Sequence, residues 1–306
     1  MESKQLFILG APRSGTTFLA SVLSDSKYGT PIETHFITKY YKSLRKYGDL
    51  SSLSNFRQLI KQILRERPIQ QWGLTLNIDR FFLELSPDYS YSHIVDALLS
   101  RYRLGNPGAS WGDKTPHYLE DVEILPKLFP NAKFIYIVRD GRDVALSLLK
   151  KPWGPNNIVS CAEYWTLLNS RDDELDKIGQ EGSLFFLHYE KLLEDPVGTT
   201  RDIYGFLGEE LPESRVSFIQ KYTKTTNKEK WKSEMTANQI RRFEAVAGNK
   251  LKALGYPVLN PKSRLSNLEI VFFSAHEILS KGVHLFNLNI VDWVLIRLGK
   301  KQPFAD

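Results

Sequence analysis

The sequence of 306 residues contains one cysteine, Cys161, and no long apolar run. A single cysteine excludes an internal disulfide and a cysteine-rich metal site. No stretch approaches the roughly 18 consecutive apolar residues of a membrane-spanning helix. The first expected strand follows Met1 closely and leaves no room for a signal or transit peptide. We therefore expect a cytoplasmic protein without a transmembrane segment.

Runs of like charge, internal repeats and low-complexity segments are missing as well. The chain has 41 Lys and Arg against 35 Asp and Glu, a formal net charge of +6 that no basic tail concentrates. This distribution argues against a nucleic acid partner and suits an anionic small ligand. With 42% hydrophobic and 25% charged residues, the composition is that of a globular protein with a sizeable core.

The most informative segment that is present is Leu6–Leu19, LFILGAPRSGTTFL. It reads as an apolar strand, a loop bracketed by Gly10 and Gly15, and the start of a helix. Backbone N–H groups of such a loop converge on one phosphate. The ATP-binding version places a lysine after the second glycine. Here Thr16 occupies that position, and Arg13 brings the positive charge into the loop instead.

A second phosphate site is predicted after the apolar run Phe134–Val138. Arg139 at its end supplies a charged fork, and Ser147 adds a hydroxyl inside the following helix. An ordinary surface turn capped by Asp140 or Asp143 is the alternative. Taken together with the first loop, this segment suggests a ligand with phosphates at two ends.

A rival hypothesis is a metal-dependent P-loop kinase that uses ATP. An apolar strand that ends near Asp140 resembles the magnesium-holding strand of ATP-using folds, with Thr17 as the second metal contact. The missing lysine, however, leaves the β- and γ-phosphates without their main cation. A non-catalytic nucleotide-binding scaffold is a third hypothesis.

The order of elements predicts an α/β fold with a P-loop-type parallel sheet flanked by helices on both faces. Ligands of such sheets bind beyond the carboxyl ends of the strands, where both loops fall. Strands are expected at Leu6–Leu9, Phe134–Val138 and Leu184–Leu187. Helices are expected at Thr16–Leu23, Phe56–Leu64, His93–Arg103, Tyr118–Leu128, Val144–Leu149, Val159–Ile178, Pro196–Leu207 and from Thr236 to Leu254.

Residues 1–260 are expected to form this domain, and residues 261–306 a helical C-terminal extension. Amphipathic helices are predicted at Leu268–Leu279 and Ile290–Leu298. They would pack on the domain or lie at an interface, so a homodimer through these helices is an open alternative.

The segments Gly10–Thr17 and Val138–Asp143 with Ser147 resemble the two nucleotide motifs of the sulfotransferase family, in the style of bacterial and tyrosylprotein sulfotransferases. The resemblance covers about residues 5 to 257. It implies transfer of a sulfuryl group from 3′-phosphoadenosine 5′-phosphosulfate (PAPS), with no metal required. It also implies that Arg139 and Ser147 bind the 3′-phosphate. The 5′-phosphosulfate would be bound by Pro12, Arg13, Ser14, Gly15, Thr16 and Thr17.

Other segments resemble further landmarks of this family. Lys114, in WGDKTP, matches a lysine near the bridging oxygen or the substrate, and Tyr189 matches a tyrosine that contacts the nucleotide. Lys230, Trp231 and Lys232 resemble a terminal loop that covers the 3′-phosphate and the adenine. A core position for Tyr189 or Trp231, and solvated lysines, are the alternatives.

Glu33 is the first candidate for the base that takes the acceptor's proton, because it resembles the catalytic glutamate of tyrosylprotein sulfotransferases. An ordinary surface carboxylate is its alternative. His117 is the second candidate, although it stands three residues after Lys114 where cytosolic sulfotransferases place a histidine two residues after. His35 is a further one.

The acceptor is expected to be a small molecule, namely a metabolite, lipid or saccharide, sulfated on a hydroxyl or an amine. The segment Lys39–Arg103 is the predicted acceptor lid. Its many aromatic residues suit a ring-bearing acceptor, although core packing would explain most of them equally well.

Overall fold

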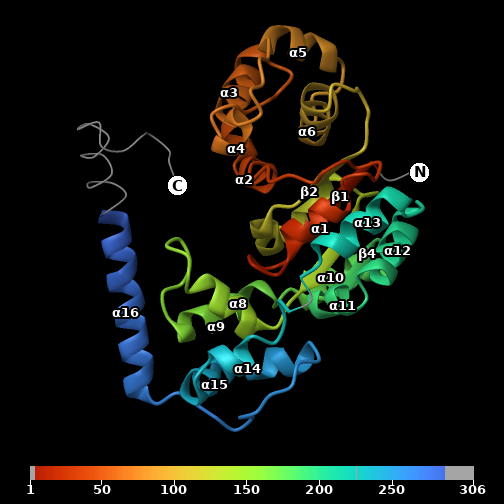
Figure 1. Ribbon diagram of the computed structural model, residues 1–306. Helices are drawn as coiled ribbons and strands as arrows, with labels where there is room; N and C mark the ends of the chain where they lie inside the picture. The colour runs from red at the N-terminus through yellow and green to blue at the C-terminus, as the bar shows by residue number, and fades with distance from the viewer. Residues whose placement is uncertain (1–3, 225, 287–306) are drawn as a thin grey trace, which may run out of the picture. The chain divides into compact units, whose positions relative to one another are not determined.

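The computed structural model describes residues 4–224 and 226–286 and divides into two compact units (Figure 1). Unit 1 comprises Met1–Val138 and Arg171–Thr226, and unit 2 comprises Arg139–Ser170 and Asn227–Asp306. The chain therefore leaves unit 1 at the end of one strand and returns to it thirty-odd residues later. The expected division at residue 260 stays a prediction.

Unit 1 contains a four-stranded parallel sheet in the order β2-β1-β3-β4. The strands are β1 (Gln5–Leu9), β2 (Trp111–Asp113), β3 (Lys133–Val138) and β4 (Leu184–His188). Phe7 is in register with Asp113 on one side and with Phe134 on the other. The predicted strands are confirmed, and β2 is an additional one. Its three residues are too short a run to stand out in the sequence.

Both faces of the two central strands, β1 and β3, are buried, as their continuous apolar runs predict. Alternate residues of the strands, including Leu6, Ile8 and Ile135, pack with residues of α1 (Thr16–Val22), α11 (Tyr189–Glu194) and α12 (Pro196–Leu207). On the other face, the ring of Phe7 packs against Trp111, Phe129 and Phe134, with centroids 5.4 to 5.8 Å apart within the group. The predicted fold class is confirmed.

The remaining helices of unit 1 are α2 (Ile37–Lys42), η1 (Leu44–Tyr47), α3 (Leu53–Ile63), α4 (Arg67–Gln70), α5 (Ile78–Leu85), α6 (Tyr91–Ala97), η2 (Leu98–Arg103), η3 (Pro116–Ile124), α7 (Leu125–Leu128), α10 (Asp172–Gln180) and α13 (Glu213–Tyr222). Most of them lie between β1 and β2; η3 and α7 lie between β2 and β3, α10 precedes β4 and α13 follows α12. Several aromatic residues of the predicted lid, such as Phe56, Phe81 and Tyr91, are buried core residues at 0 to 4% exposure.

Unit 2 is helical. It contains α8 (Gly141–Leu148), α9 (Ile158–Leu168), α14 (Trp231–Glu234), α15 (Ala237–Ala253) and α16 (Asn267–Phe286). The predicted C-terminal extension is present as α16, and Asn157 Nδ2 donates to the carbonyl of Phe273 on it at 3.1 Å. The predicted helix Ile290–Leu298 lies outside the described residues.

Local capping signals predict helix ends well. Asp195 accepts from the N–H of Gly198 at the start of α12, and Gly208 ends that helix at a φ of 77°. Thr236 and Gln239 form the expected capping box of α15. Such signals act within one turn and need no tertiary contact.

Three predicted helices are divided. Val159–Ile178 ends at Leu168 and resumes at Asp172, with Asn169 Nδ2 donating to the carbonyl of Trp165 at 2.6 Å between them. Tyr118–Leu128 is a 3₁₀ segment followed by one turn of α-helix, and His93–Arg103 passes into a π-helix at Leu98. Side-chain periodicity does not distinguish these forms. None of the helices in residues 4–224 and 226–286 combines the length and apolar character needed to span a bilayer.

Candidate functional site

The glycine-bracketed loop of unit 1 has a shape that only glycine permits at two positions. A Cβ atom on Gly10 would lie 2.6 Å from the carbonyl oxygen of Ile137. Gly15 has a φ of 92°, and a Cβ there would lie 2.4 Å from the ring of Tyr189. Tyr189 is buried at 4% exposure and thus supports the loop through packing.

Polar groups in this loop fit a bound anion. Arg13 is exposed and adopts a φ of 74°, a conformation that non-glycine residues rarely take. The N–H of Ser14 donates to the carbonyl of Ala11 at 3.1 Å and closes the turn. The buried Ser14 hydroxyl has no hydrogen-bond partner within the described residues. A buried orphan hydroxyl in a phosphate-type loop is a group that a ligand would satisfy.

A second segment is held beside the loop by backbone pairing. Ile32 forms an isolated parallel bridge with Asp113 of β2. The N–H of Lys114 donates to the carbonyl of Ile32 at 2.6 Å. Gly112 allows this approach, because a Cβ there would lie 2.8 Å from the ring of Pro31. Residues far apart in the sequence, 31–35 and 112–115, thus run side by side.

This pairing joins two of the predicted catalytic residues. Lys114 Nζ forms an ion pair with Glu33 Oε1 and lies 3.4 Å from the hydroxyl of Thr17. The Lys114 side chain is 9% exposed, whereas that of Glu33 is 41% exposed. The pair is therefore anchored on the lysine side and open to solvent on the glutamate side.

His35 makes the second contact to Glu33. Its Nε2 lies 3.0 Å from Glu33 Oε2. The hydrogen bond from His35, together with the hydrogen bond and charge of Lys114, lowers the pKa of Glu33 from 4.5 to about 2 against the opposing effect of burial. His35 has a φ of 58°, and its N–H donates to Thr115 Oγ1 at 3.4 Å. The histidine thus positions the carboxylate from a sparsely populated backbone conformation.

His117, the second candidate base, is placed differently. It is exposed, and its Nδ1 pairs with Glu120 Oε1 at 3.1 Å. Its ring centroid lies 6.2 Å from that of His35. His117 therefore pairs with Glu120, one helical turn along the same segment. Glu33 pairs instead with Lys114 and His35.

Unit 2 contains the residues predicted to bind the 3′-phosphate. Arg139 is 6% exposed, and its Nη2 donates to the carbonyl of Asn227 at 2.9 Å and approaches Asp143 Oδ2 at 3.4 Å. Ser147 is half-buried in α8. Burial raises the pKa of Asp143, whose Oδ1 accepts from the N–H of Trp231 at 2.9 Å.

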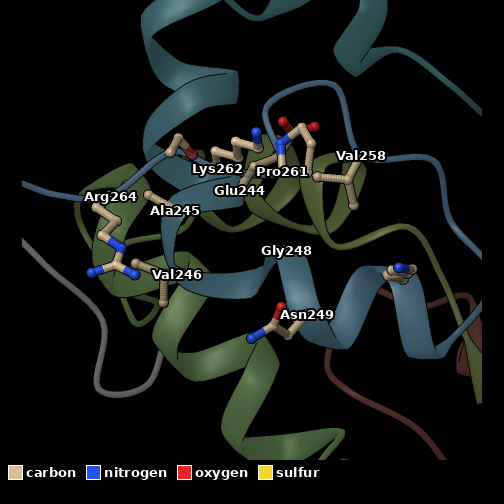
Figure 2. Close-up of a pocket in the computed structure, with 11 residues that line it drawn as sticks. Glu244, Ala245, Val246, Gly248, Asn249, Val258, Pro261, Lys262 and Arg264 are labelled. Atoms are coloured by element: carbon tan, nitrogen blue, oxygen red, sulfur yellow. The ribbon is translucent and has the colours of Figure 1, made fainter.

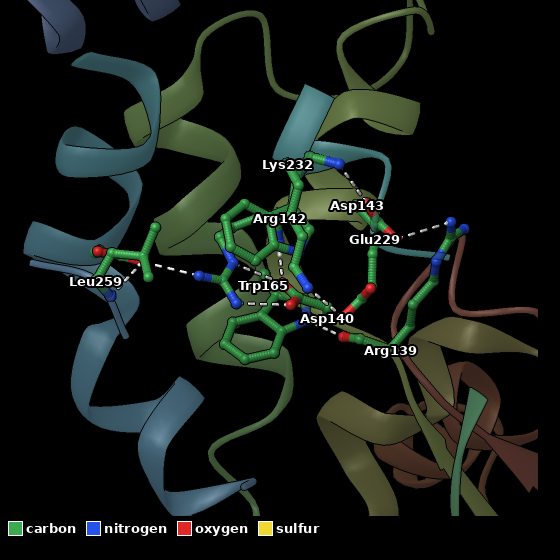
Figure 3. A network of polar contacts seen from close by, with 10 residues as sticks. Arg139, Asp140, Arg142, Asp143, Trp165, Glu229, Lys232 and Leu259 are labelled. Carbon is green, nitrogen blue, oxygen red and sulfur yellow. Dashed lines mark hydrogen bonds and ion pairs between the residues drawn. The ribbon is translucent and has the colours of Figure 1, made fainter. Parts of the chain in front are cut away.

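A buried ion network organises unit 2, and Figure 3 shows part of it. Arg142 is fully buried and donates to both oxygens of Asp140 and, at 2.8 Å, to Glu244. Its guanidinium lies 3.5 Å from the ring centroid of Trp231. Trp231 is 2% exposed, so its ring packs inside the unit. Lys230 and Lys232 beside it are exposed, and Lys232 pairs with Glu229 at 2.6 Å.

Glu244 belongs to the Phe243-Glu244 pair that resembles a family landmark, but it is not one of the site residues predicted from the sequence. Its oxygens accept from Arg142, from the N–H groups of Leu259 and Asn260 and from the Asn260 amide. The helical spacing of the sequence could have indicated that Glu244 is buried, because it shares the buried face of α15 with Ile240, Ala247 and Leu251. A carboxylate on an apolar face implies a buried partner.

Unit 2 also contains a cavity of about 590 Å³ beside α15 (Figure 2). The residues that line it fall between positions 244 and 264, and they include Lys252, Lys262 and Arg264. None of the predicted site residues lines it. In the described part of the chain, His, Cys, Asp and Glu side chains form no group of three or more that could hold a metal. The predicted independence from metal stays a prediction.

The sequence is similar to proteins of one known family. The sequence matches the sulfotransferase family over residues 5–213. It is 26% identical over 215 residues to a protein-tyrosine sulfotransferase of Drosophila melanogaster, covering 67% of this chain and 38% of that protein. It is 25% identical over 210 residues to protein-tyrosine sulfotransferase A of Caenorhabditis elegans, covering 66% and 49%. The chain thus spans half the length of these relatives or less.

A solved structure shares the fold. The sulfotransferase domain from the curacin biosynthetic pathway has a TM-score of 0.51 at 17% identity, covering 84% of this chain and 99% of that domain. The family match extends over more than half of the residues, from β1 to the start of α13. The chain belongs to the sulfotransferase family.

Proposed function

We propose that the protein transfers a sulfuryl group from PAPS to a hydroxyl or amine of a small-molecule acceptor and releases 3′,5′-ADP. The acceptor's oxygen or nitrogen forms a bond to sulfur while the bond between sulfur and the bridging oxygen of the 5′-phosphate breaks. The acceptor's proton leaves to a base. Family membership and the geometry of unit 1 support this proposal.

The contact of Lys114 with both Glu33 and Thr17 carries the proposal. It places an ammonium group, a carboxylate and a loop hydroxyl within reach of one another. In-line transfer needs a cation for the charge that develops on the leaving oxygen and a base for the acceptor's proton. Lys114 would serve the first need and Glu33 the second.

The other residues would bind the donor. Pro12, Arg13, Ser14, Gly15, Thr16 and Thr17 would hold the 5′-phosphosulfate, and the buried Ser14 hydroxyl is free to donate there. Arg139 and Ser147 are the proposed ligands of the 3′-phosphate, with Lys230, Trp231 and Lys232. The buried ring of Trp231 favours a supporting role, through Arg142, over direct stacking on adenine.

The lowered pKa of Glu33 has a consequence for its role. A carboxylate with a pKa of about 2 is ionised throughout the physiological range and is a weak base. When Lys114 turns to the negative oxygens of the donor, one of the two contacts that lower this pKa is lost. The carboxylate would then become a stronger base at the moment when the donor is in place.

The kinase hypothesis is less well supported. Both carboxylate oxygens of Asp140 accept hydrogen bonds from Arg142, which is itself fully buried. A carboxylate engaged in this way is poorly placed to coordinate magnesium. Thr16 also stands at the position of the phosphate-binding lysine.

Calorimetry and a radiolabelled-donor assay test the proposal. 3′,5′-ADP should bind without magnesium, and the protein should transfer label from PAPS to an acceptor. Tighter binding of ATP that requires magnesium would overturn the proposal in favour of the kinase. Nucleotide binding with no turnover on a broad acceptor panel would favour a scaffold. The cytoplasmic location, the homodimer through the C-terminal helices and the absence of a nucleic acid partner stay predictions.

A further inference from the structure

A cavity in unit 1 is lined by residues that adjoin Glu33 and Lys114. It has a volume of about 380 Å³, within the range of small-molecule sites. His35, which contacts Glu33 at 3.0 Å, forms part of its wall, and so does Thr115, the neighbour of Lys114. The cavity therefore opens one side chain away from the proposed base.

Every residue that lines this cavity carries a polar or ionisable group. Its ten residues are His35, Thr38, Lys39, Lys42, Glu66, Thr115, His117, Tyr118, Glu120 and Asp121. Within the described part of the chain, the lining includes no aliphatic residue, phenylalanine, tryptophan or methionine. The hydroxyl of Tyr118 is already used, since it lies 2.6 Å from Thr34 Oγ1 and accepts from the N–H of Ile37 at 2.9 Å.

Cations and anions alternate along the wall. Lys39 pairs with Glu66 at 2.6 Å, Lys42 with Asp121 at 2.6 Å, and His117 with Glu120 at 3.1 Å. Two lysines thus face three carboxylates, so neither sign dominates. The lysine ends of two of these pairs are more than half exposed, at 59% and 55%. Such pairs are weak and can exchange partners with a ligand.

We propose that this cavity is the acceptor subsite and that it takes a neutral, hydroxyl-rich acceptor of the saccharide class. The proposal rests on the proposed sulfotransferase function. A sugar hydroxyl both donates and accepts, so one ring can bond to an ammonium and to a carboxylate at once. A hydroxyl directed past His35 would present its proton to Glu33 and its oxygen to the sulfur of the donor.

The same lining disfavours other acceptors. A flat apolar phenol would remove lysine and carboxylate groups from water. Its ring would supply no hydrogen bonds in place of those that these groups form with water. A strongly acidic peptide would bring its carboxylates next to those of Glu66, Glu120 and Asp121. The aromatic residues of the predicted lid do not compensate, because the described lining residues from this segment are Lys39, Lys42 and Glu66.

Ligand-observed NMR separates binding at this cavity from turnover. Methyl glycosides of glucose, galactose and N-acetylglucosamine should show saturation transfer with the wild-type protein. The double variant Lys42→Met/Asp121→Asn should weaken this binding about tenfold, as expected for the loss of hydrogen bonds to charged groups. The matched control is Arg57→Met/Asp79→Asn, an exposed pair at 2.5 Å outside the cavity, which should bind like wild type.

Turnover with radiolabelled PAPS supplies the second measurement. The glycosides should be sulfated, and the double variant should raise the acceptor KM about tenfold while the PAPS KM is unchanged. The saccharide subsite is contradicted if the protein prefers 2-naphthol or a tyrosine peptide as acceptor. It is also contradicted if the double variant does not weaken glycoside binding. 3′,5′-ADP binding with no glycoside binding contradicts it as well. Glycoside binding without any 3′,5′-ADP binding would keep the cavity as a saccharide-binding site, but it would overturn the proposed function and with it the acceptor role of the cavity.

Discussion

The two units of this protein use charged side chains in opposite ways. In unit 2, the Arg142 and Glu244 side chains are both fully buried, and Asp140 is 7% exposed. In unit 1, Lys114 is nearly buried but its partner Glu33 is 41% exposed. In a buried network whose carboxylate oxygens all accept hydrogen bonds, no charged group is available to bind a ligand. Such a network holds the backbone around it in place. A pair with one open side can exchange its partner for a ligand. The contrast separates a structural ion network from one suited to chemistry.

The largest effect is expected from removing Arg142. The variant Arg142→Met leaves the carboxylates of Asp140 and Glu244 buried without their cation, so the free energy of unfolding should fall by about 3–5 kcal/mol. Urea denaturation followed by circular dichroism measures it. Lys150→Met, which breaks an exposed pair with Glu234 at 3.5 Å, is the control and should change stability by less than about 1 kcal/mol. Equal losses in the two variants would erase the distinction between buried and open pairs.

The next largest effect is expected from Glu33→Gln. If Glu33 is the base, kcat should fall about 10²- to 10⁴-fold, while unfolding by urea changes little because the side chain is partly exposed. His117→Gln should reduce kcat by less than about threefold, since its pair with Glu120 is exposed. If kcat fell further in the His117 variant than in the Glu33 variant, His117 and not Glu33 would be the base.

Lys114→Met should lower kcat about 10²- to 10³-fold through loss of charge stabilisation on the leaving oxygen. Binding of 3′,5′-ADP, measured by calorimetry, should weaken far less than this. If the lysine served only to hold Glu33, the variant would instead have the same kcat as Glu33→Gln. The dependence of kcat on the leaving group of the donor would then be unchanged from wild type. A donor analogue with a better leaving group makes that comparison.

The smallest effect concerns the titration of Glu33. Its folded-state pKa of about 2 is below the ordinary 4.5, so its contribution to stability is complete above pH 4.5 and is lost as the pH falls towards 2. His35→Gly removes the largest cause of the lowering and also suits the backbone φ of 58°. Carboxyl ¹³C shifts should show the pKa of Glu33 rising towards 4.5. His117→Ala is the control and should leave it in place.

Local signals in the sequence predicted much of the secondary structure of both units. The apolar runs of β1 and β3, the glycines of the loop and the caps at Asp195 and Thr236 act over a few residues, so they can be read without the fold. The division of Val159–Ile178 at Asn169 was missed, because a polar side chain that bonds its own helix leaves the apolar spacing intact.

The site was predicted in parts. Glu33, Lys114 and Thr17 were each named from the sequence, but their contact depends on residues 31–35 running beside β2. The position of His35, which contacts Glu33 and lines the neighbouring cavity, depends on the same pairing. Periodicity and capping carry no information about such long-range neighbours.

The sequence by itself determined the family, the phosphate-binding loop and the parallel sheet, because each depends on short segments whose residue types act locally. The tertiary structure decided which charges pair and which stay open. It buried Trp231 against Arg142, left Glu33 half open beside Lys114, and lined the neighbouring cavity with polar side chains. Burial and distance set the strength of the interaction between two charges, and only the folded chain fixes both.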